Sequence, residues 1–294
     1  MKKRFSLVSV VVTALLALSV SSALAAAPPA PAEDHQELGG CCGCPPDPIV
    51  TGDVYVGPMN KYVFRGNDLS FNQWVTQGGV DLTYRQWTLS YWTNYQARNS
   101  ARSLVSAGTA PNRGISENDI YINYVYNPWW SPTKTDGTSY LQFNVGNNLY
   151  DYENVTTNEL YLKATLQMME LLNPTFQVYW DWDKSTRAGL YYTASVSYKY
   201  DIERNFLDAT AGALVSYNQR NWNAATNPNS NDPRDGAYNA FHDYELTAGV
   251  DWMVNGHVTI TPSYQFSDAL SRTAHDLGGI RAQHNFGIKA QFSF

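Results

Sequence analysis

Apolar and polar side chains alternate along most of the chain after residue 52. In residues 284–294, Phe286, Ile288, Phe292 and Phe294 fall on one face, and polar residues fall between them. Successive side chains of a β-strand point to opposite sides, so this alternation predicts a strand with one apolar and one polar face. The segment ends on an aromatic residue of its apolar face. This combination is typical of a strand that has lipid on one side and water on the other.

Eleven further segments alternate in the same way and are separated by turn residues. They are expected at 53–65, 74–84, 87–95, 118–127, 140–149, 159–168, 175–183, 189–200, 206–218, 243–253 and 257–266. Segment 159–168 could also form a short helix, but its strict alternation favours a strand. The predicted fold is all-β: a closed antiparallel transmembrane β-barrel of about 12 strands, with a disordered N-terminal tail. A soluble β-barrel or sandwich is the alternative.

The lengths of the connections assign the two ends of this barrel. If the first strand runs outward, the long connections at 96–117, 219–242 and 267–283 lie outside the cell. Most of the connections at the other end are short, with 128–139 as the exception. Because the strand number is even, both termini are expected in the periplasm.

The 21 Tyr and 9 Trp residues also sort by height along the predicted strands. Two aromatic girdles, one at each membrane interface, are a feature of transmembrane barrels. The periplasmic rim is expected to hold Tyr84, Trp87, Tyr124, Tyr126, Tyr198, Tyr200, Trp252, Phe292 and Phe294. The outer rim is expected to hold Tyr62, Phe64, Trp74, Trp180, Trp182, Tyr217, Tyr244, Tyr264 and Phe266. Sugar-binding surfaces are a minor alternative for this enrichment.

Residues 1–26 have the pattern of a cleaved signal peptide. A basic start at Lys2-Lys3-Arg4 precedes an apolar run from Leu7 to Val20, and Ala23-Leu24-Ala25 is a small-x-small cleavage signature. A membrane anchor is the alternative, but the run is too short to span a bilayer comfortably. Together with the barrel pattern, this export signal predicts the outer membrane of a Gram-negative cell.

Residues 27–51 form a Pro-rich segment that we expect to be a flexible periplasmic tail, and 52–294 are assigned to the barrel. All three cysteines, Cys41, Cys42 and Cys44, lie in the tail. The oxidising export compartment allows a disulfide, and the odd count leaves one thiol over for another chain or a metal. Tail chemistry without a function, a metal or redox role, and lipid attachment all stay open.

Removal of residues 1–26 takes away three basic residues and no acids, so the net charge changes from −6 to −9. An acidic exported chain without a basic patch is a poor candidate for binding nucleic acid. No catalytic, cofactor-binding or metal-binding residue is predicted.

The opening of the barrel region resembles a family of outer-membrane porins often labelled TorF-like. The resemblance rests on Gly52-Asp53-Val54, the stretch from Tyr62 to Gly66, Gln77 to Asp81, and Trp87 to Trp92. It implies a pore-type barrel, and it supplies no substrate or catalytic residue to carry over. The three-cysteine tail is not a feature associated with that family.

These patterns favour a porin-like channel for passive diffusion of small hydrophilic solutes. The residues expected to line the pore are Lys61, Arg65, Asp81, Lys163, Asp181, Lys199, Asp208, Glu245, Asp251 and Lys289. Their mixed signs predict modest charge selectivity. Alternatively, these charges pair across the lumen and plug it.

Two other functions stay open. A structural barrel or sheath of a larger envelope assembly would use the cysteine tail and Trp129-Trp130 to dock a periplasmic partner. An outer-membrane lipid hydrolase would need a base such as His242 beside Asp243, but no serine stands in a recognisable nucleophile context. The other expected partners are outer-membrane lipid and the barrel-assembly machinery, the latter through the strand ending at Phe294.

Overall fold

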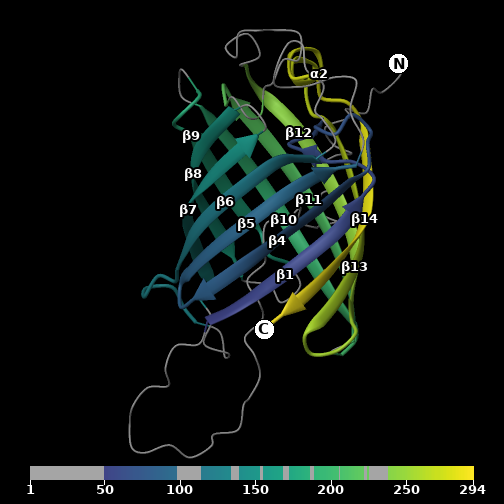
Figure 1. Ribbon diagram of the computed structural model, residues 1–294. Coiled ribbons are helices and arrows are strands. Elements are labelled where there is room, and N and C mark those ends of the chain that lie inside the picture. The colour runs from purple at the N-terminus through teal and green to yellow at the C-terminus, as the bar shows by residue number, and fades with distance from the viewer. Residues whose placement is uncertain are drawn as a thin grey trace, which may run out of the picture.

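Twelve strands form one closed antiparallel barrel (Figure 1). The computed structural model describes residues 50–97, 114–133, 139–152, 155–167, 172–185, 189–204, 206–221, 224 and 238–294. The barrel strands are β1 (Val50–Met59), β4 (Val75–Tyr84), β5 (Trp87–Gln96), β6 (Gly114–Tyr126), β7 (Leu141–Tyr152), β8 (Val155–Leu166), β9 (Thr175–Asp181), β10 (Leu190–Glu203), β11 (Leu207–Gln219), β12 (Asn239–Met253), β13 (Val258–Ala269) and β14 (Gln283–Ser293). The all-β barrel expected from the sequence is thereby confirmed.

Each strand presents its apolar side chains on the outside of the barrel. In β8, Leu160 and Leu162 are 41% and 44% exposed. Glu159, the residue before Leu160, is fully buried on the inner side. This alternation confirms that the segment expected at 159–168 is a strand and not a helix. A face of exposed leucines around a closed sheet is the arrangement that a hydrocarbon environment stabilises.

Each strand pairs with its neighbours in the chain, and β1 pairs with β14 to close the cylinder. At this seam the backbone nitrogen of Gly52 donates to the carbonyl of Phe294 at 3.0 Å, and the nitrogen of Phe294 donates to the carbonyl of Gly52 at 2.9 Å. A closed barrel has no edge strand whose backbone groups stay unpaired.

The two ends of the barrel differ. The end at which β4 turns into β5 at residues 85–86 is called the short-turn end here, and the opposite end is called the long-loop end. The short helix α2 (Arg272–Leu277) lies at the long-loop end (Figure 1). It was not expected from the sequence, and it begins where the Ser271 hydroxyl accepts a hydrogen bond from the Ala274 nitrogen at 3.1 Å. None of the helices in the described ranges is long and apolar enough to cross a membrane.

One predicted strand is wrong in its second half. The segment expected at 53–65 leaves the barrel wall at Met59, and Tyr62 and Phe64 do not belong to the outer aromatic girdle. Tyr62 is instead buried against Met59, Val75 and Trp92. The alternation continued past Met59, but the side chains after it pack inside the barrel and not against lipid.

The predicted signal peptide at 1–26 and the three tail cysteines lie outside the described residues. Strand β1 begins at Val50, which is close to the expected start of the barrel region at 52.

Candidate functional site: a loop across the lumen

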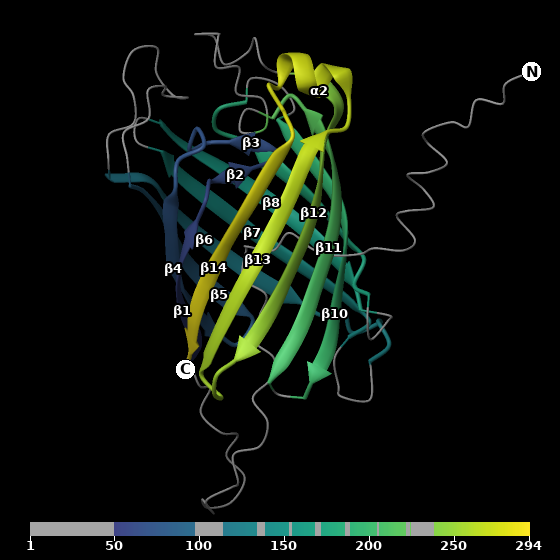
Figure 2. The ribbon, with the colours of Figure 1, turned by 90° about the vertical axis from the view of Figure 1, so that its right-hand side faces the viewer.

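Residues 60–74 join β1 to β4 at the long-loop end and fold into the barrel (Figure 2). Their centre is a small hairpin of β2 (Val63–Phe64) and β3 (Asn67–Asp68). The two turn residues, Arg65 and Gly66, have φ values of 48° and 74°. Positive φ at both positions is the mark of a type I′ turn, the tightest connection between two antiparallel strands. We call residues 60–74 the inward loop.

The base of the inward loop is fixed by a small apolar cluster. Tyr62 packs against Met59, Val75 and Trp92, and its ring centre lies 5.4 Å from that of Trp92. The descending arm is fixed by Asp68, whose carboxylate accepts backbone hydrogen bonds from Ser70 at 2.9 Å and Asn72 at 2.7 Å. This side chain therefore closes the turn that returns the chain to the wall.

The tip of the inward loop reaches the opposite wall of the barrel. Both terminal nitrogens of Arg65 bind the Glu159 carboxylate on β8, at 2.9 and 2.7 Å. Four strands separate β1 from β8 in one direction around the barrel and six in the other, so this ion pair crosses the lumen. Asn221 also accepts from Arg65 at 3.0 Å. Two parallel charge-assisted hydrogen bonds hold the guanidinium in one orientation.

Aromatic rings enclose the Arg65 guanidinium. Its central carbon lies 4.2 Å from the ring centre of Tyr191, 4.8 Å from Tyr179 and 4.9 Å from Phe64. Cation–π contacts of this kind strengthen when water is excluded, and the Arg65 side chain is only 6% exposed. The aromatic rings and the carboxylate together hold the loop tip against β8, β9 and β10.

The backbone of the loop tip is held as well. The Nε2 atom of His242 lies 2.9 Å from the Arg65 carbonyl, so this nitrogen carries the proton and donates. The Nδ1 atom is then the acceptor for the Tyr238 hydroxyl. Next to Arg65, a side-chain carbon placed on Gly66 would lie 3.1 Å from the Asp243 Cβ and 3.1 Å from the Ile280 Cγ2. Glycine adopts this positive φ without strain and leaves room for this close approach.

The surroundings of the inward loop raise the pKa values of two of its side chains, Arg65 and Tyr62. Burial by itself lowers the pKa of Arg65, but the neighbouring Glu159 carboxylate offsets this, and the pKa lies well above its ordinary value. Burial also raises the pKa of the Tyr62 phenol well above its ordinary value, and the nearby Glu117 carboxylate adds to the effect. At neutral pH the loop therefore carries a charged guanidinium at its tip and a protonated phenol at its base.

The residues predicted to line the pore are distributed between the loop and the wall. Arg65 sits at the loop tip, and Lys61 lies at the mouth, where its ammonium donates to Asn72 at 2.7 Å and Gln283 at 3.1 Å. The other eight alternate with outward apolar neighbours and lie on inner strand faces: Asp81, Lys163, Asp181, Lys199, Asp208, Glu245, Asp251 and Lys289. Whether they line an open path stays a prediction.

Most of the wall charges that lie below the inward loop gather on one half of the wall. Lys199 pairs with Asp208 at 2.6 Å, and Asp208 stands opposite Asp251 in the β11–β12 register. On the other side of the β1–β14 seam, Asp53 of β1 stands opposite Asp81 of β4. Lys163 lies on the facing half, beside uncharged polar side chains. Their hydrogen bonds include one of 2.6 Å from Tyr161 to Asn123 and one of 3.2 Å between Thr165 and Thr175.

Sequence reasoning missed several inner charges. Asp53, Glu117, Asp119, Glu159 and Asp243 also have buried side chains on the inner side of the barrel. The alternation in the sequence does indicate an inward position for Asp119 and Glu159, because each is next to an outward apolar residue. Glu117 falls outside the expected segment because β6 starts four residues earlier than expected, whereas Asp243 is the first residue of the expected segment 243–253 and has the same strand parity as Glu245. Glu159 could not be paired with Arg65 from the sequence, since they are 94 residues apart.

His242, the base that a lipid hydrolase would need, is a buried residue of β12. Its ring nitrogens contact Tyr238 and the Arg65 carbonyl, whereas the Asp243 carboxylate binds the hydroxyls of Tyr191 and Ser216. The two side chains therefore do not form a base–carboxylate pair. Within the ranges that the structure covers, no group of three or more His, Cys, Asp or Glu side chains could hold a metal ion.

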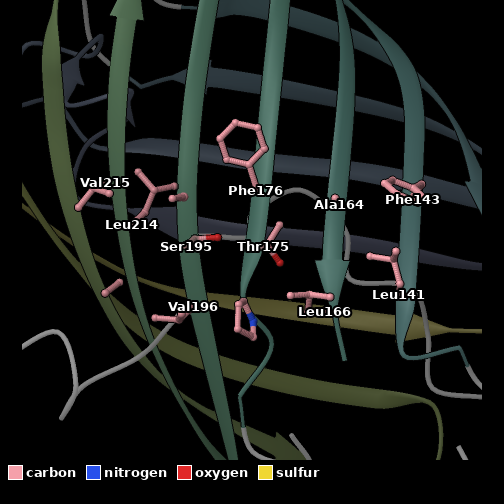
Figure 3. Close-up of a pocket in the computed structure, with 13 residues that line it drawn as sticks. Leu141, Phe143, Ala164, Leu166, Thr175, Phe176, Ser195, Val196, Leu214 and Val215 are labelled. Carbon is pink, nitrogen blue, oxygen red and sulfur yellow. The ribbon is translucent and has the colours of Figure 1, made fainter. Parts of the chain in front are cut away.

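A groove of 530 Å³ lies on the wall formed by β7 to β11 (Figure 3). Most of its lining side chains are apolar and outward-facing, including Phe143, Ala164, Phe176 and Val215. The groove forms where the small side chains of alanines lie between larger side chains on the outer face. Because these residues belong to the outer face, the groove is not part of the lumen.

A closed antiparallel barrel of twelve strands, apolar outside and charged inside, is the fold of the outer-membrane β-barrels. Among solved structures, the chain is similar to the NanC porin, with 13% identity and a TM-score of 0.50, over 83% of this chain and all of that one. It is also similar to the KdgM porin (10% identity, TM-score 0.48, 82% of this chain and 99% of that one). An outer membrane channel from Pseudomonas putida F1 matches at 10% identity and a TM-score of 0.48, over 88% of this chain and all of that one.

No family model matches the chain, and no curated protein sequence matches it. The similarity to the TorF-like family therefore stays a prediction, while the outer-membrane barrel fold is shown.

Proposed function

We propose that this protein is an outer-membrane channel for passive diffusion of small hydrophilic solutes, narrowed by the inward loop. The observation that carries the proposal is the closed twelve-stranded barrel with charged and polar side chains on its inner side, and the pairing of Arg65 with Glu159 supports the narrowing. A barrel of this size is wider than the eight-stranded kind that side chains fill. A loop that crosses the lumen and is held at its tip sets how much of that width a solute can use.

The fold and the charged inner wall support a channel. A charged inner face is costly to build unless it is solvated or paired, and water is the usual partner in a porin lumen. Below the inward loop, most of the wall charges lie on one half of the wall, with Lys163 on β8 as an exception, and this distribution gives a passing solute a charged side and a largely polar side.

Single-channel conductance in planar bilayers tests the proposal. The full chain is compared with a variant in which residues 61–73 are replaced by Asn-Gly, a turn that can join two antiparallel strands directly. The expected result is conductance by the wild type and a larger conductance by the shortened variant. Lys61→Gln is the matched control, because it changes the mouth but leaves the tip contacts in place. If neither barrel conducts, the channel proposal is refuted.

A second candidate is a closed barrel that serves as a structural part of an envelope assembly. The buried ion pair at the tip favours it, because this contact fixes the loop inside the lumen. If the wild-type barrel shows no conductance while the shortened variant conducts, this result would support the closed barrel over an open porin.

The location and partners follow from the same proposal. We place the barrel in the outer membrane of a Gram-negative cell, with both termini in the periplasm and lipid around the outer face. The barrel-assembly machinery would act on β14, and a periplasmic partner would bind the tail that carries Cys41, Cys42 and Cys44. Cysteine labelling of intact cells at Asn255, in the turn between β12 and β13 at the short-turn end, tests the orientation, since the proposal requires this site to be protected.

A further inference from the structure

Three acceptor side chains meet on the inner wall beside the base of the inward loop. Glu117 and Asp119 lie on β6, and Asn94 stands directly opposite Glu117 in the β5–β6 register. All three are 1% to 3% exposed. A β-bulge at this point changes the register after Asn94, so that Ser116 is the extra residue on β6. Bulges of this kind re-aim side chains and are common next to functional sites.

One oxygen of each of these side chains has no hydrogen-bond partner among the described residues. These atoms are Oδ1 of Asn94, Oε1 of Glu117 and Oδ1 of Asp119. The remaining atoms are occupied: the Asn94 amide donates to Ser116 at 2.8 Å, Tyr121 donates to Asp119 at 2.5 Å, and Tyr62 donates to Glu117. The three oxygens are all acceptors, so they can accept from a hydrogen-bond donor or bind a cation.

No basic side chain within the described ranges forms an ion pair with Glu117 or Asp119. The buried cation of the loop, Arg65, is committed to Glu159, and the Lys61 ammonium donates to Asn72 and Gln283. The carboxyl groups of Glu117 and Asp119 are close enough to hydrogen bond to each other if one of them is protonated. Two carboxylates held together away from water need either a shared proton or a cation between them.

We propose that Glu117, Asp119 and Asn94 form a cation subsite in the lumen, and that the channel therefore passes cationic solutes in preference to anionic ones. This inference rests on the proposed channel function. Carboxylate and amide oxygens without nitrogen or sulfur ligands suit hard cations and ammonium groups. Three oxygen ligands are too few for a resident metal, and weak binding is what conduction requires. The charges around the loop agree, because Glu117, Asp119, Asp243 and Glu245 are buried acids of the inner side. The basic residues of the loop are Arg65, which is paired with Glu159, and Lys61, which lies at the mouth.

This inference differs from the modest selectivity expected from the sequence. That expectation counted ten inner charges of mixed sign and left out Glu117, Asp119 and Asp243. Adding them makes the part of the lumen beside the inward loop acidic.

The reversal potential of the full chain in planar bilayers under a KCl gradient tests the subsite. The wild type is expected to show a potassium preference, and E117Q/D119N is expected to bring the permeability ratio of potassium to chloride close to one. The matched control is E203Q/D268N, which removes two acids from β10 and β13, strands that do not adjoin β5 or β6. It is expected to keep the wild-type ratio.

The possible outcomes separate the two proposals. Absence of conductance in the wild type would refute the channel and this inference together. Conductance without a potassium preference, or a preference that E117Q/D119N leaves unchanged, would overturn only the subsite. Terbium luminescence excited through Trp92 gives a second measurement on the detergent-solubilised chain. A signal present in the wild type and lost in the single variant Glu117→Gln supports the subsite, whereas no signal in the wild type indicates a shared proton and overturns it.

Discussion

Arg65 and Glu159 form a two-bond ion pair in the interior of the barrel, with nitrogen–oxygen distances of 2.9 and 2.7 Å. Arg65 lies on the loop that leaves β1, and Glu159 lies on the opposite wall in β8. Since Glu159 is fully buried and the Arg65 side chain is 6% exposed, neither charge has solvent as an alternative partner. The contact therefore acts as a latch on the inward loop: while it holds, the loop crosses the lumen.

Glu159→Gln should release this latch. The substitution leaves the Arg65 charge buried without its counter-ion, at a cost of about 3–5 kcal/mol. The loop can avoid this cost by leaving the lumen, whereas the barrel itself is held by its strand pairing. We expect larger and more variable single-channel conductance, together with trypsin cleavage after Arg65 detected by mass spectrometry.

Two variants control this experiment. Glu203→Gln removes an acid at the exposed end of β10 and should behave as the wild type does. The double variant R65Q/E159Q removes both charges and leaves a neutral pair that can still hydrogen bond, so it should be less open than Glu159→Gln alone. Equal conductance in all of these variants would show that the ion pair does not hold the loop.

Gly66→Ala should loosen the same tip through the backbone. Alanine at φ 74° is strained, and its Cβ would press on Asp243 and Ile280 at 3.1 Å. Strain of this kind costs about 1–3 kcal/mol. The expected result is faster trypsin cleavage after Arg65 than in the wild type, with no change in the barrel's own resistance to denaturant. Gly256→Ala, at a turn where the added carbon meets open space, is the control and should not alter cleavage.

The sequence predicted the barrel wall because two-sided alternation is a local property. The expected segment at 175–183 and the observed β9 start at the same residue, and the expected and observed β14 are offset by one residue at each end. Each strand must match its side chains to lipid and water independently of the others, so the pattern can be found one segment at a time. Strand 53–65 is the exception, because its apolar residues after Met59 face the interior.

The candidate site could not be predicted in the same way. Tyr62 and Phe64 follow the alternation of a lipid-facing strand, and only the turn at Arg65-Gly66 indicates a reversal. The partners of Arg65 come from β8, β9, β10 and β12, which lie far away in the chain. Contacts that depend on how a closed sheet brings opposite walls together leave no periodic signal in either segment.

Leu162→Arg tests the two-sidedness of the wall itself. Leu162 is 44% exposed on the outer face of β8, where it stands opposite Val145 and Val178. An arginine on the lipid side of a transmembrane barrel costs about 2–4 kcal/mol near the middle of the bilayer. We expect the midpoint of urea unfolding in lipid vesicles to fall accordingly. Gln142→Arg places the same side chain on the inner face of β7 and should change the unfolding midpoint little. Equal shifts of the midpoint in Leu162→Arg and Gln142→Arg would contradict a lipid-facing outer wall.

Alkaline pH should release the base of the inward loop through Tyr62. The pKa of its phenol is raised above the ordinary value of 10.0 by burial, so the protonated form is favoured when the loop is docked. Docking is therefore fully stabilised below about pH 10 and loses stability as the pH rises toward the docked pKa, because the undocked phenol ionises first. Conductance should increase with pH in this range.

Tyr62→Phe keeps the ring against Trp92 but cannot ionise, so its conductance should depend less on alkaline pH. Because this variant also loses the hydrogen bond to Glu117, its conductance should be higher than that of the wild type at all pH values. Tyr84→Phe, on the outer face, should retain the wild-type pH profile; the same profile in Tyr62→Phe would assign the alkaline response to a different group.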